Sequence, residues 1–231
     1  MTPKQQVLIR LAYRWPRRNP LKARLEREGR TDWLEIGGFG FDQGFRCMGI
    51  TDPADISEQH RDRYTKLNLL EQPEAVADHE AAYDLIRMQH VFEHFGPEDG
   101  VDVLRMCARM LKPGGYLLMT TPDLALSVNA YRQRFRWILP NVKKYHRSRI
   151  PDDAPPCFNF SMIAHQYGYS RIDHDGEQHC WCYDYEGLAY QVNRAGGFAK
   201  TQRLGLLHPL ASIPFTHNRA GQEVCILAQR A

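Results

Sequence analysis

The segment from Tyr83 to Asp123 places the tightest limit on the fold of this chain. It contains YDLIRMQHVFEHF, in which Leu85, Ile86 and Met88 form a short apolar run, and VLRMCARMLKPGGYLLMTTPD, in which Tyr116–Thr121 form a second. Between the two runs, apolar residues recur at helical spacing, at Val101, Leu104, Cys107, Ala108 and Leu111. The pair Pro113-Gly114 predicts a tight turn, because glycine readily takes the positive φ that a type II turn needs. A strand, a helix and a second strand in this order predict a right-handed βαβ unit in a parallel sheet.

This unit also predicts where a ligand would bind. Open α/β sheets bind ligands beyond the carboxyl ends of their strands. Those ends carry polar side chains here, which belong to Gln89, His90, Glu93, His94, Thr121 and Asp123.

Size and composition are typical of a soluble α/β protein. The 231 residues are 43% hydrophobic and 25% charged, which is enough apolar material for one large domain with a sizeable core. A net charge of +3 is too small to argue for nucleic acid by itself. The six cysteines have no CxxC spacing, so we expect reduced thiols in a cytoplasmic protein. We expect neither a signal peptide nor a transmembrane segment, since no apolar run has the required length.

The remaining elements follow from local signals. Asn19 as N-cap, Pro20 at the first position and Gly29 past the end predict a helix. A glycine-rich loop, too short for a crossover helix, separates the first two strands. The other expected elements are strands at Trp33–Gly37, Arg46–Thr51, Tyr64–Leu69, Ala199–Leu207 and Glu223–Gln229, a helix near Glu71–His79, and a helix at Tyr183–Ala195 that ends at Gly196-Gly197.

The sequence predicts a basic extension, a main domain and a lid. The extension comprises residues 1–31, with a first helix that includes Val7 and Trp15. One interpretation is that the extension contacts an anionic membrane surface or acceptor. The other, which we favour, is that it packs on the sheet and exposes its basic face to solvent. Residues 32–231 form the main domain, and residues 124–182 form an insertion over the acceptor.

The order of these parts resembles the class I S-adenosylmethionine-dependent methyltransferases. The likeness is strongest to a small bacterial branch associated with sugar, lipopolysaccharide and capsule modification. The motifs that match are LEIGGFGFDQGF, YDLIRMQHVFEHF, RMLKPGGYLLMTTPD and YDYEGLAYQVNRAGGF. The resemblance implies a Rossmann-like α/β fold with a mostly parallel seven-stranded sheet and an antiparallel last strand.

The resemblance also implies that S-adenosylmethionine binds and that S-adenosylhomocysteine is the product. Glycines allow the backbone to approach the ligand closely, and a carboxylate can accept hydrogen bonds from both ribose hydroxyls. By this resemblance, Gly37 and Gly38 would allow close approach to the ligand, and Glu35 would bind the amino group of the tail. The ribose would be bound by Asp52, with Asp55 as second choice. Adenine would be contacted by Asn68 and Leu69, and the methionine part by Gln89 and His90.

Each of these residues also has a purely structural reading. Gly37-Gly38 can make an ordinary turn, Asp52-Pro53 is a plain turn signal, and Asn68 can cap a loop. Their order, with LKPGG downstream, favours cofactor binding. The loop departs from the family where Phe39 or Phe41 replaces a glycine, which leaves a non-catalytic binding or scaffold protein as an alternative.

The string His90-x-x-Glu93-His94 has three readings. It fits a zinc-peptidase pattern, but that pattern lies within a helix and this string follows a strand. Some related methyltransferases of the ubiquinone pathway and of small RNAs carry ExxEH here and bind a divalent ion. His90 stands where their first glutamate would be, so we favour a site without metal in which Glu93 and His94 brace the next loop.

Methyl transfer to a hydroxyl needs alignment and removal of a proton. A neutral histidine is the natural base near pH 7. The candidates are His94, His165 and His179.

The segment Tyr131–Arg149 interleaves seven basic residues with aromatic ones. Such a segment suits phosphate, carboxylate or sugar recognition, although a solvated surface loop has the same composition. We therefore expect O-methylation of a glycan or another polar, anionic small molecule. RNA is the alternative acceptor, since similar composition also binds nucleic acid.

Overall fold

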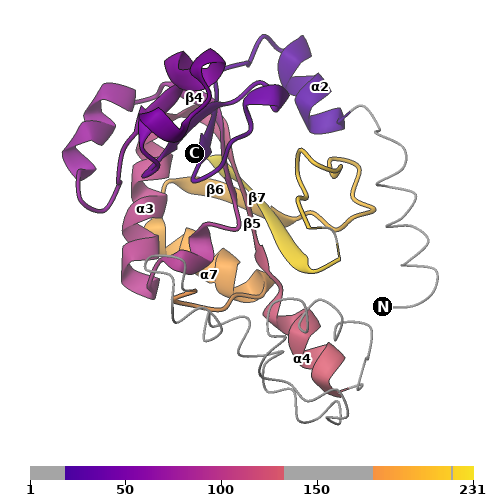
Figure 1. The fold of residues 1–231 in the computed structure, drawn as a ribbon. Coiled ribbons are helices and arrows are strands. Elements are labelled where there is room, and N and C mark those ends of the chain that lie inside the picture. The colour runs from indigo at the N-terminus through magenta and orange to yellow at the C-terminus, as the bar shows by residue number, and fades with distance from the viewer. Residues whose placement is uncertain (1–18, 133–178, 220) are drawn as a thin grey trace.

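The computed structural model describes residues 19–132, 179–219 and 221–231 and shows an α/β architecture (Figure 1). One seven-stranded sheet has the order β3-β2-β1-β4-β5-β7-β6. Its strands are β1 Trp33–Ile36, β2 Arg46–Gly49, β3 Tyr64–Lys66, β4 Tyr83–Gln89, β5 Leu111–Pro122, β6 Phe198–Arg203 and β7 Glu223–Arg230.

Strand directions confirm the fold expected from the sequence. β1 is parallel to β2 and β4, β2 is parallel to β3, and β4 is parallel to β5. β7 runs antiparallel to both of its neighbours, β5 and β6. The carboxyl ends of the five parallel strands β1 to β5 therefore lie along one edge of the sheet, where a ligand site is expected.

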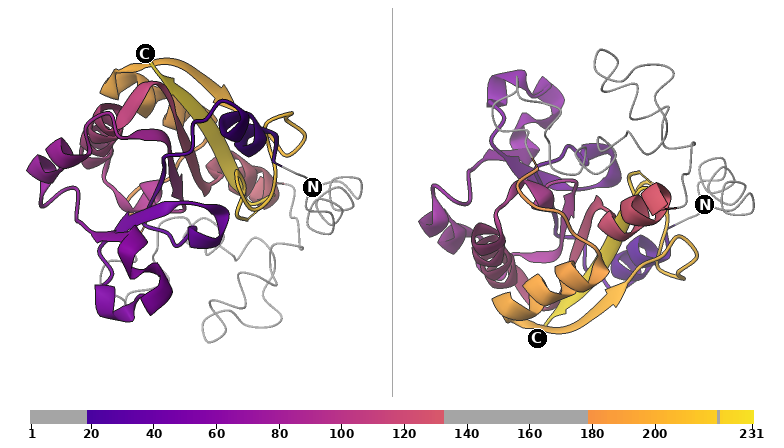
Figure 2. Two further views of the ribbon diagram at one scale, coloured as in Figure 1. Left: turned by 90° about the horizontal axis from the view of Figure 1, so that it is seen from above. Right: turned by 90° about the horizontal axis from the view of Figure 1, so that it is seen from below.

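Helices cover both faces of the sheet. The α-helices are α2 Pro20–Arg27, α3 Pro97–Met110, α4 Leu124–Arg132 and α7 Tyr185–Ala195, and the 3₁₀ turns are η1 Phe41–Gln43, η2 Pro53–Asp55, η3 Glu58–Arg63, η4 Pro73–His79 and η5 Phe92–His94. Figure 2 shows α3 and α7 on one face and α2 on the other. α4 continues from the end of β5 (Figure 1).

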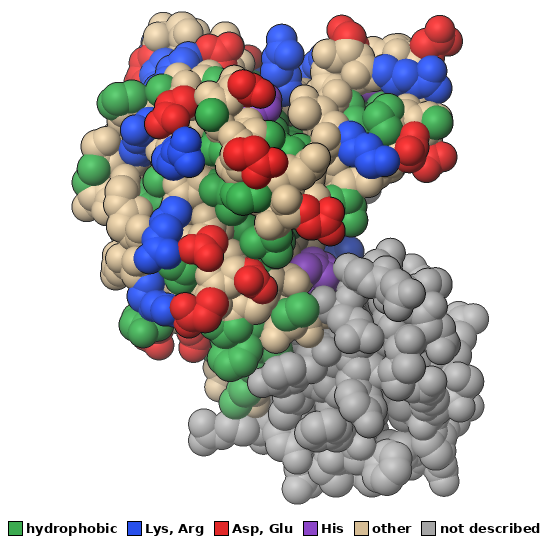
Figure 3. All heavy atoms as spheres, turned by 90° about the vertical axis from the view of Figure 1, so that its left-hand side faces the viewer, with side chains coloured by type: hydrophobic (Ala, Val, Ile, Leu, Met, Phe, Trp, Pro, Cys, Tyr) green, Lys and Arg blue, Asp and Glu red, His purple; other side chains and the backbone are tan. Residues whose placement is uncertain are grey.

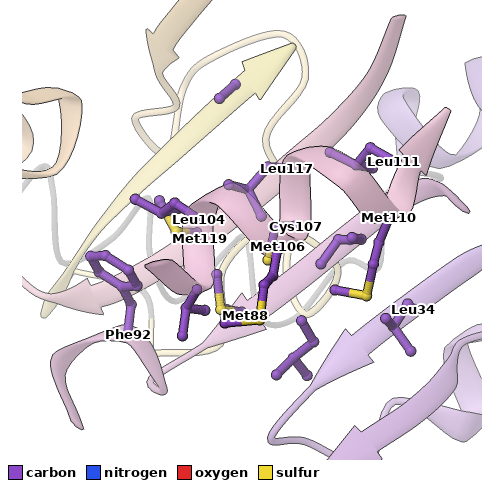
Figure 4. Close-up of a cluster of buried hydrophobic side chains, with 14 of the residues drawn as sticks. Leu34, Met88, Phe92, Leu104, Met106, Cys107, Met110, Leu111, Leu117 and Met119 are labelled. Carbon is purple, nitrogen blue, oxygen red and sulfur yellow. The ribbon is translucent and has the colours of Figure 1, made fainter. Parts of the chain in front are cut away.

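Each face has its own apolar core. Side chains of α3, α7 and the sheet form the first core, part of which is drawn in Figure 4 with Leu34, Met88, Leu104 and Leu117 among the labelled residues. The second core lies on the opposite face and includes Leu21 and Leu25 of α2, Trp33, Leu85, Phe45 and Phe215. Alternate strand residues thus point into opposite cores, as a sheet covered on both faces requires.

Several local predictions are confirmed. The side chain of Asn19 accepts a hydrogen bond from Lys22 N (2.9 Å) and caps α2, and Pro20 begins the helix. Between β1 and β2 the described chain has a single 3₁₀ turn, η1, in place of a crossover helix. α7 starts two residues later than expected, with Asp184 as N-cap.

Four elements differ from the prediction. β6 ends at Arg203, four residues before the predicted Leu207. The expected helix near Glu71–His79 is the 3₁₀ turn η4. β3 ends at Lys66, before Asn68 and Leu69. β5 begins at Leu111 rather than Tyr116, because Leu111 pairs with Tyr83 and a bulge that contains Pro113-Gly114 follows. Gly114 does take the expected positive φ, of 70°.

Some predictions fall on residues that are not described. They are the first helix of the basic extension, His165 and most of the basic segment Tyr131–Arg149. Within the described chain, every helix is too short or too polar to cross a membrane. The side chains of Leu21 and Leu25, from the predicted extension, are fully buried against the sheet.

Candidate active site

The glycine turn after β1 packs closely on its neighbours. Gly37 has φ of +72° and donates a hydrogen bond from its amide to Met48 O (2.7 Å). A Cβ on Gly37 would lie 2.7 Å from Val91 Cγ2, and one on Gly38 would lie 2.6 Å from Glu35 Cδ. The fold therefore requires glycine at both positions, and neither carries a side chain that would obstruct a ligand at the ends of β1 and β4.

Glu35 forms a buried ion pair beneath this turn. Its side chain is 3% exposed, and Oε1 accepts from Nε and from the second guanidinium nitrogen of Arg87, both at 2.8 Å. Arg87 also donates to Gln43 Oε1 (2.6 Å) and Phe215 O (3.0 Å). Glu35 Oε2 is buried and has no hydrogen-bond partner among the described residues.

Asp52 and Asn68 follow β2 and β3 and both shape turns. Asp52 accepts from Ala54 N (2.9 Å) and from Lys66 Nζ (3.1 Å), and it is well exposed to solvent. These interactions lower the pKa of Asp52, so the carboxylate is ionised at neutral pH. Asn68 Oδ1 accepts from Leu70 N (3.2 Å), while the Leu69 side chain is buried in the first core. Any adenine contact by Leu69 would therefore have to come from its backbone.

Exposed apolar side chains surround the same strand ends. Phe39 follows β1, Ile50 follows β2 and Leu70 follows β3, with exposed fractions of 58%, 68% and 40%. The Phe39 ring lies 6.4 Å from the ring of Tyr64, between centroids. Phe41, by contrast, is buried and stacks on His60. Exposed apolar groups on three adjacent strand ends suit a flat, weakly polar ring such as a nucleobase.

His90 belongs to a buried hydrogen-bond network at the end of β4. Its Nε2 donates to Glu223 Oε2 (2.8 Å), and His217 Nδ1 lies 3.0 Å from Glu223 Oε1. Burial opposes the charge on Glu223, but the hydrogen bonds from His217 and His90 outweigh it and lower the pKa of Glu223 to about 2. Burial likewise opposes charge on His90, and the carboxylates of Glu223 and Glu93 raise its pKa overall.

The strain at His90 fits this network. His90 has φ of +55°, a conformation that non-glycine residues rarely adopt, and its amide donates to Thr120 O (2.9 Å). The preceding Gln89 donates from Nε2 to Pro214 O (3.2 Å). Both residues thus lie at the carboxyl end of β4, where the sequence places them, with their side chains turned towards the segment that precedes β7.

Of the three candidate bases, two lie together in the described structure. His94 ends η5, and its ring packs edge-on against the ring of His179 with 5.0 Å between centroids. His179 Nε2 is 3.9 Å from Glu93 Oε1. His165 is outside the described residues.

Sequence reasoning missed Arg87, Glu223 and His217. Arg87 had one signal, a cation inside the apolar strand YDLIRMQ, which requires a buried partner. Glu223 had a similar signal, because this charged residue stands directly before the apolar run VCILA. Nothing in the sequence singles out His217.

Comparisons with known proteins agree with this architecture. A family model described as a methyltransferase domain matches residues 13–201. Among solved structures, the CurJ carbon methyltransferase has 14% identity and a TM-score of 0.50, over 90% of this chain and 51% of that one, so this chain spans about half of its length. A SAM dependent methyltransferase from Archaeoglobus fulgidus has 16% identity and a TM-score of 0.46, over 90% and 92% of the two chains.

A third similar structure is the 1,6-didemethyltoxoflavin-N1-methyltransferase of Burkholderia thailandensis. It has 14% identity and a TM-score of 0.47, over 92% of this chain and 77% of that one. No curated protein sequence matches the chain.

The fold and the matched family model together define an α/β methyltransferase. The chain belongs to the methyltransferase domain family, whose model matches most of its length.

Proposed function

We propose that this protein transfers a methyl group from S-adenosylmethionine to a hydroxyl of a polar small molecule or glycan. The observation that supports the cofactor is the set of groups along the carboxyl ends of β1 to β4. A glycine turn follows β1, the ionised carboxylate of Asp52 follows β2, the amide of Asn68 follows β3, and Gln89 ends β4. An exposed apolar side chain also stands beyond each of β1, β2 and β3.

These residues fit the parts of the cofactor. The backbone turn at Gly37 and Gly38 would lie against the methionine tail, and the buried, unpaired Oε2 of Glu35 beneath the turn would accept from its amino group. Asp52 is ionised and exposed and would accept from the ribose hydroxyls. Phe39 would lie beside the adenine ring, since it is exposed rather than packed into the loop. Once bound, the cofactor supplies a methyl group on a positively charged sulfonium.

The acceptor side is proposed from the histidines. His94 and His179 lie together just beyond β4, so either is placed to take the proton that a hydroxyl acceptor loses. The basic and aromatic composition of Tyr131–Arg149 supports a polar, anionic acceptor. A glycan that carries carboxylate or phosphate groups has both properties.

The surface gives less support to RNA. On the face shown in Figure 3, acidic and basic side chains alternate over the coloured residues rather than gathering by sign. Nucleic-acid binding draws its affinity from clustered positive charge. We therefore keep RNA as an outcome of the test and not as a second proposal.

Binding and transfer are tested separately. Calorimetric titration of the purified chain with S-adenosylhomocysteine should give one site, and Asp52→Asn should weaken it. Asp102→Asn is a matched control, since Asp102 is an exposed acid on α3 that forms an ion pair with Arg105 (2.8 Å). Absence of any binding heat would contradict the proposal and favour a scaffold.

Transfer is followed with a cofactor labelled on its methyl group. We expect label to pass to sugars or other polar hydroxyl compounds, and the product to have the chemical stability of an ether. Label on RNA, or on carbon or nitrogen of a small molecule, would contradict the proposed acceptor and leave the cofactor assignment standing.

A further inference from the structure

We propose that Glu93, His94 and His179 form a binding site for a divalent transition-metal ion such as Zn²⁺. Each residue offers a donor atom, and the three atoms lie within 4.8 Å of one another. The sequence favoured a site without metal, and its weaker alternative combined Glu93 and His94 with His90. The structure brings His179 into the group in place of His90.

The donor separation suits a site that closes around an ion. Zinc bonds to nitrogen and oxygen are about 2.0–2.2 Å long, which puts tetrahedral donors roughly 3.4 Å apart. A contraction on the order of an ångström brings the three atoms to that spacing. His94 and His179 are partly exposed, so rotation of their rings can supply it.

The fold holds the three residues together from two distant segments. η5 carries Glu93 and His94, with the His94 amide donating to Val91 O (3.0 Å). The amides of Cys180 and Trp181 both donate to Glu93 O, at 2.8 and 3.1 Å. These two backbone hydrogen bonds hold the chain at His179 beside Glu93. The backbone position of His179 therefore does not depend on contacts of the Glu93 and His179 side chains.

The carboxylate of Glu93 is the observation that points to a ligand. Its side chain is 1% exposed, and neither oxygen has a hydrogen-bond partner among the described residues. The nearest groups to Oε1 are His90 Nδ1 at 3.4 Å and His179 Nε2 at 3.9 Å. A buried carboxylate without hydrogen bonds is costly, and a bound cation removes that cost.

His90 does not belong to the donor set. Its Nε2 is held by Glu223 at 2.8 Å, and His90 is not among the three residues whose donor atoms lie within 4.8 Å of one another. It acts as a positioning residue, because it lies against the Glu93 carboxylate and orients it.

Two imidazoles and one carboxylate select the class of ion. Imidazole suits Zn²⁺, Fe²⁺, Co²⁺ and Ni²⁺, whereas Mg²⁺ and Ca²⁺ prefer oxygen ligands alone. Three protein ligands also leave coordination positions open, as in catalytic rather than structural zinc sites. An ion here changes one part of the proposed function, because His94 and His179 would be its ligands and neither would be the base. The ion would instead act as a Lewis acid that lowers the pKa of a bound acceptor hydroxyl, so that its proton can pass to solvent.

The test measures metal binding without cofactor or acceptor. The full-length chain, stripped with a chelator, is titrated with Zn²⁺ in a calorimeter and with Co²⁺ followed by visible absorption. We expect one ion per chain and no comparable binding of Mg²⁺. Replacing a partner that only supports a ligand costs about 10–100-fold in affinity, so His179→Ala and Glu93→Gln should each cost at least about 100-fold.

Matched variants exclude other sites. His208→Ala, in the loop after β6, should leave Zn²⁺ affinity within about threefold of wild type. Surface substitutions usually change free energies by an amount of about this size. The double variant Cys180→Ser with Cys182→Ser should also retain binding, since these thiols are near the site but outside the donor set. Circular dichroism of each variant, and of His179→Ala in particular, shows that loss of metal is not loss of fold.

Three results would overturn the proposal. They are no stoichiometric binding of Zn²⁺ or Co²⁺, binding that survives His179→Ala, or binding that disappears with the two thiols. A parallel titration with S-adenosylhomocysteine separates this proposal from the proposed function. Cofactor binding without metal binding rejects only the metal site.

Discussion

Replacing Arg87 with methionine should destabilise the protein strongly. The Arg87 side chain is 1% exposed and neutralises Glu35, whose side chain is 3% exposed. Methionine fills part of the volume but donates nothing, so Glu35 becomes a buried charge without a counter-ion, and Gln43 Oε1 and Phe215 O lose their donor. Breaking a buried pair by removing one partner costs about 3–5 kcal/mol.

That loss is large on the scale of protein stability and easily measured. Total free energies of unfolding are about 5–15 kcal/mol, so Arg87→Met removes a third or more of a typical value. With a urea dependence of about 2–3 kcal/mol per molar, the unfolding midpoint should fall by about 1–2.5 M. The measurement is urea denaturation followed by tryptophan fluorescence, which reports on Trp33 in the same core.

Two further variants make the argument refutable. Arg105→Met removes an exposed pair with Asp102 and should leave the midpoint near wild type. Combining Arg87→Met with Glu35→Leu removes both charges and should recover most of the lost stability, because apolar replacements of buried pairs are often neutral. A double variant as unstable as the sum of its single changes would show that shape, and not uncompensated charge, accounts for the loss.

Three other changes have defined outcomes. Gly37→Ala should lower the free energy of unfolding by about 1–3 kcal/mol in urea denaturation, because the new side chain would combine a φ of +72° with contact to Val91. Gly29→Ala is the control and should cost less, since Gly29 has a φ of +70° and nothing within 4 Å of its Cβ position. Equal costs would refute the role of the Val91 contact. Asp52→Asn should weaken S-adenosylhomocysteine binding about 10-fold in calorimetry. The stability of the variant should stay close to wild type, since the asparagine side chain still accepts from Ala54 N. Unchanged affinity would exclude a hydrogen bond between Asp52 and the ribose. The pKa of Glu223 is lowered from an ordinary 4.5 to about 2 in the folded protein, so its contribution to stability is present above pH 4.5 and is lost as the pH falls towards 2. Glu223→Gln should therefore be less stable at neutral pH and should lose less stability over that range, in denaturation series at stepped pH.

The fold could be predicted because its signals are local. Asn19 and Pro20 mark the start of α2 within a few residues. The apolar runs of β4 and β5 can be recognised in the sequence without knowing which strands they pair with. The errors came where pairing across the sheet decides the outcome. β5 begins at Leu111 because Tyr83 offers it a partner, and no local signal in KPGG shows that the chain is already in the sheet.

The candidate site could be predicted only in part, for a similar reason. Residues that follow strands can be placed on one edge from topology alone, which is how His90 was predicted at this edge, whereas Asp52 was implied by the family resemblance. Arg87 and Glu35 are 52 residues apart and meet because β1 and β4 pair in one register. His179 reaches Glu93 through backbone bonds made by a segment whose path the sequence does not reveal.

The missing crossover helix explains why the ion pair is where it is. A helix between β1 and β2 would cover the sheet face that carries Trp33 and Arg87. Here Phe45 and Phe215 cover it next to Leu21 and Leu25 of α2, with ring centroids 5.7 Å from Trp33 and 5.4 Å from each other. The Arg87 guanidinium lies 4.0 Å from the centre of the Phe45 ring, and a Cβ on Gly40 would lie 2.4 Å from both members of the pair. The glycine loop is therefore supported by a charged pair and aromatic rings instead of by a helix. Its shape should respond to changes at Arg87 even though Arg87 is not expected to touch the cofactor.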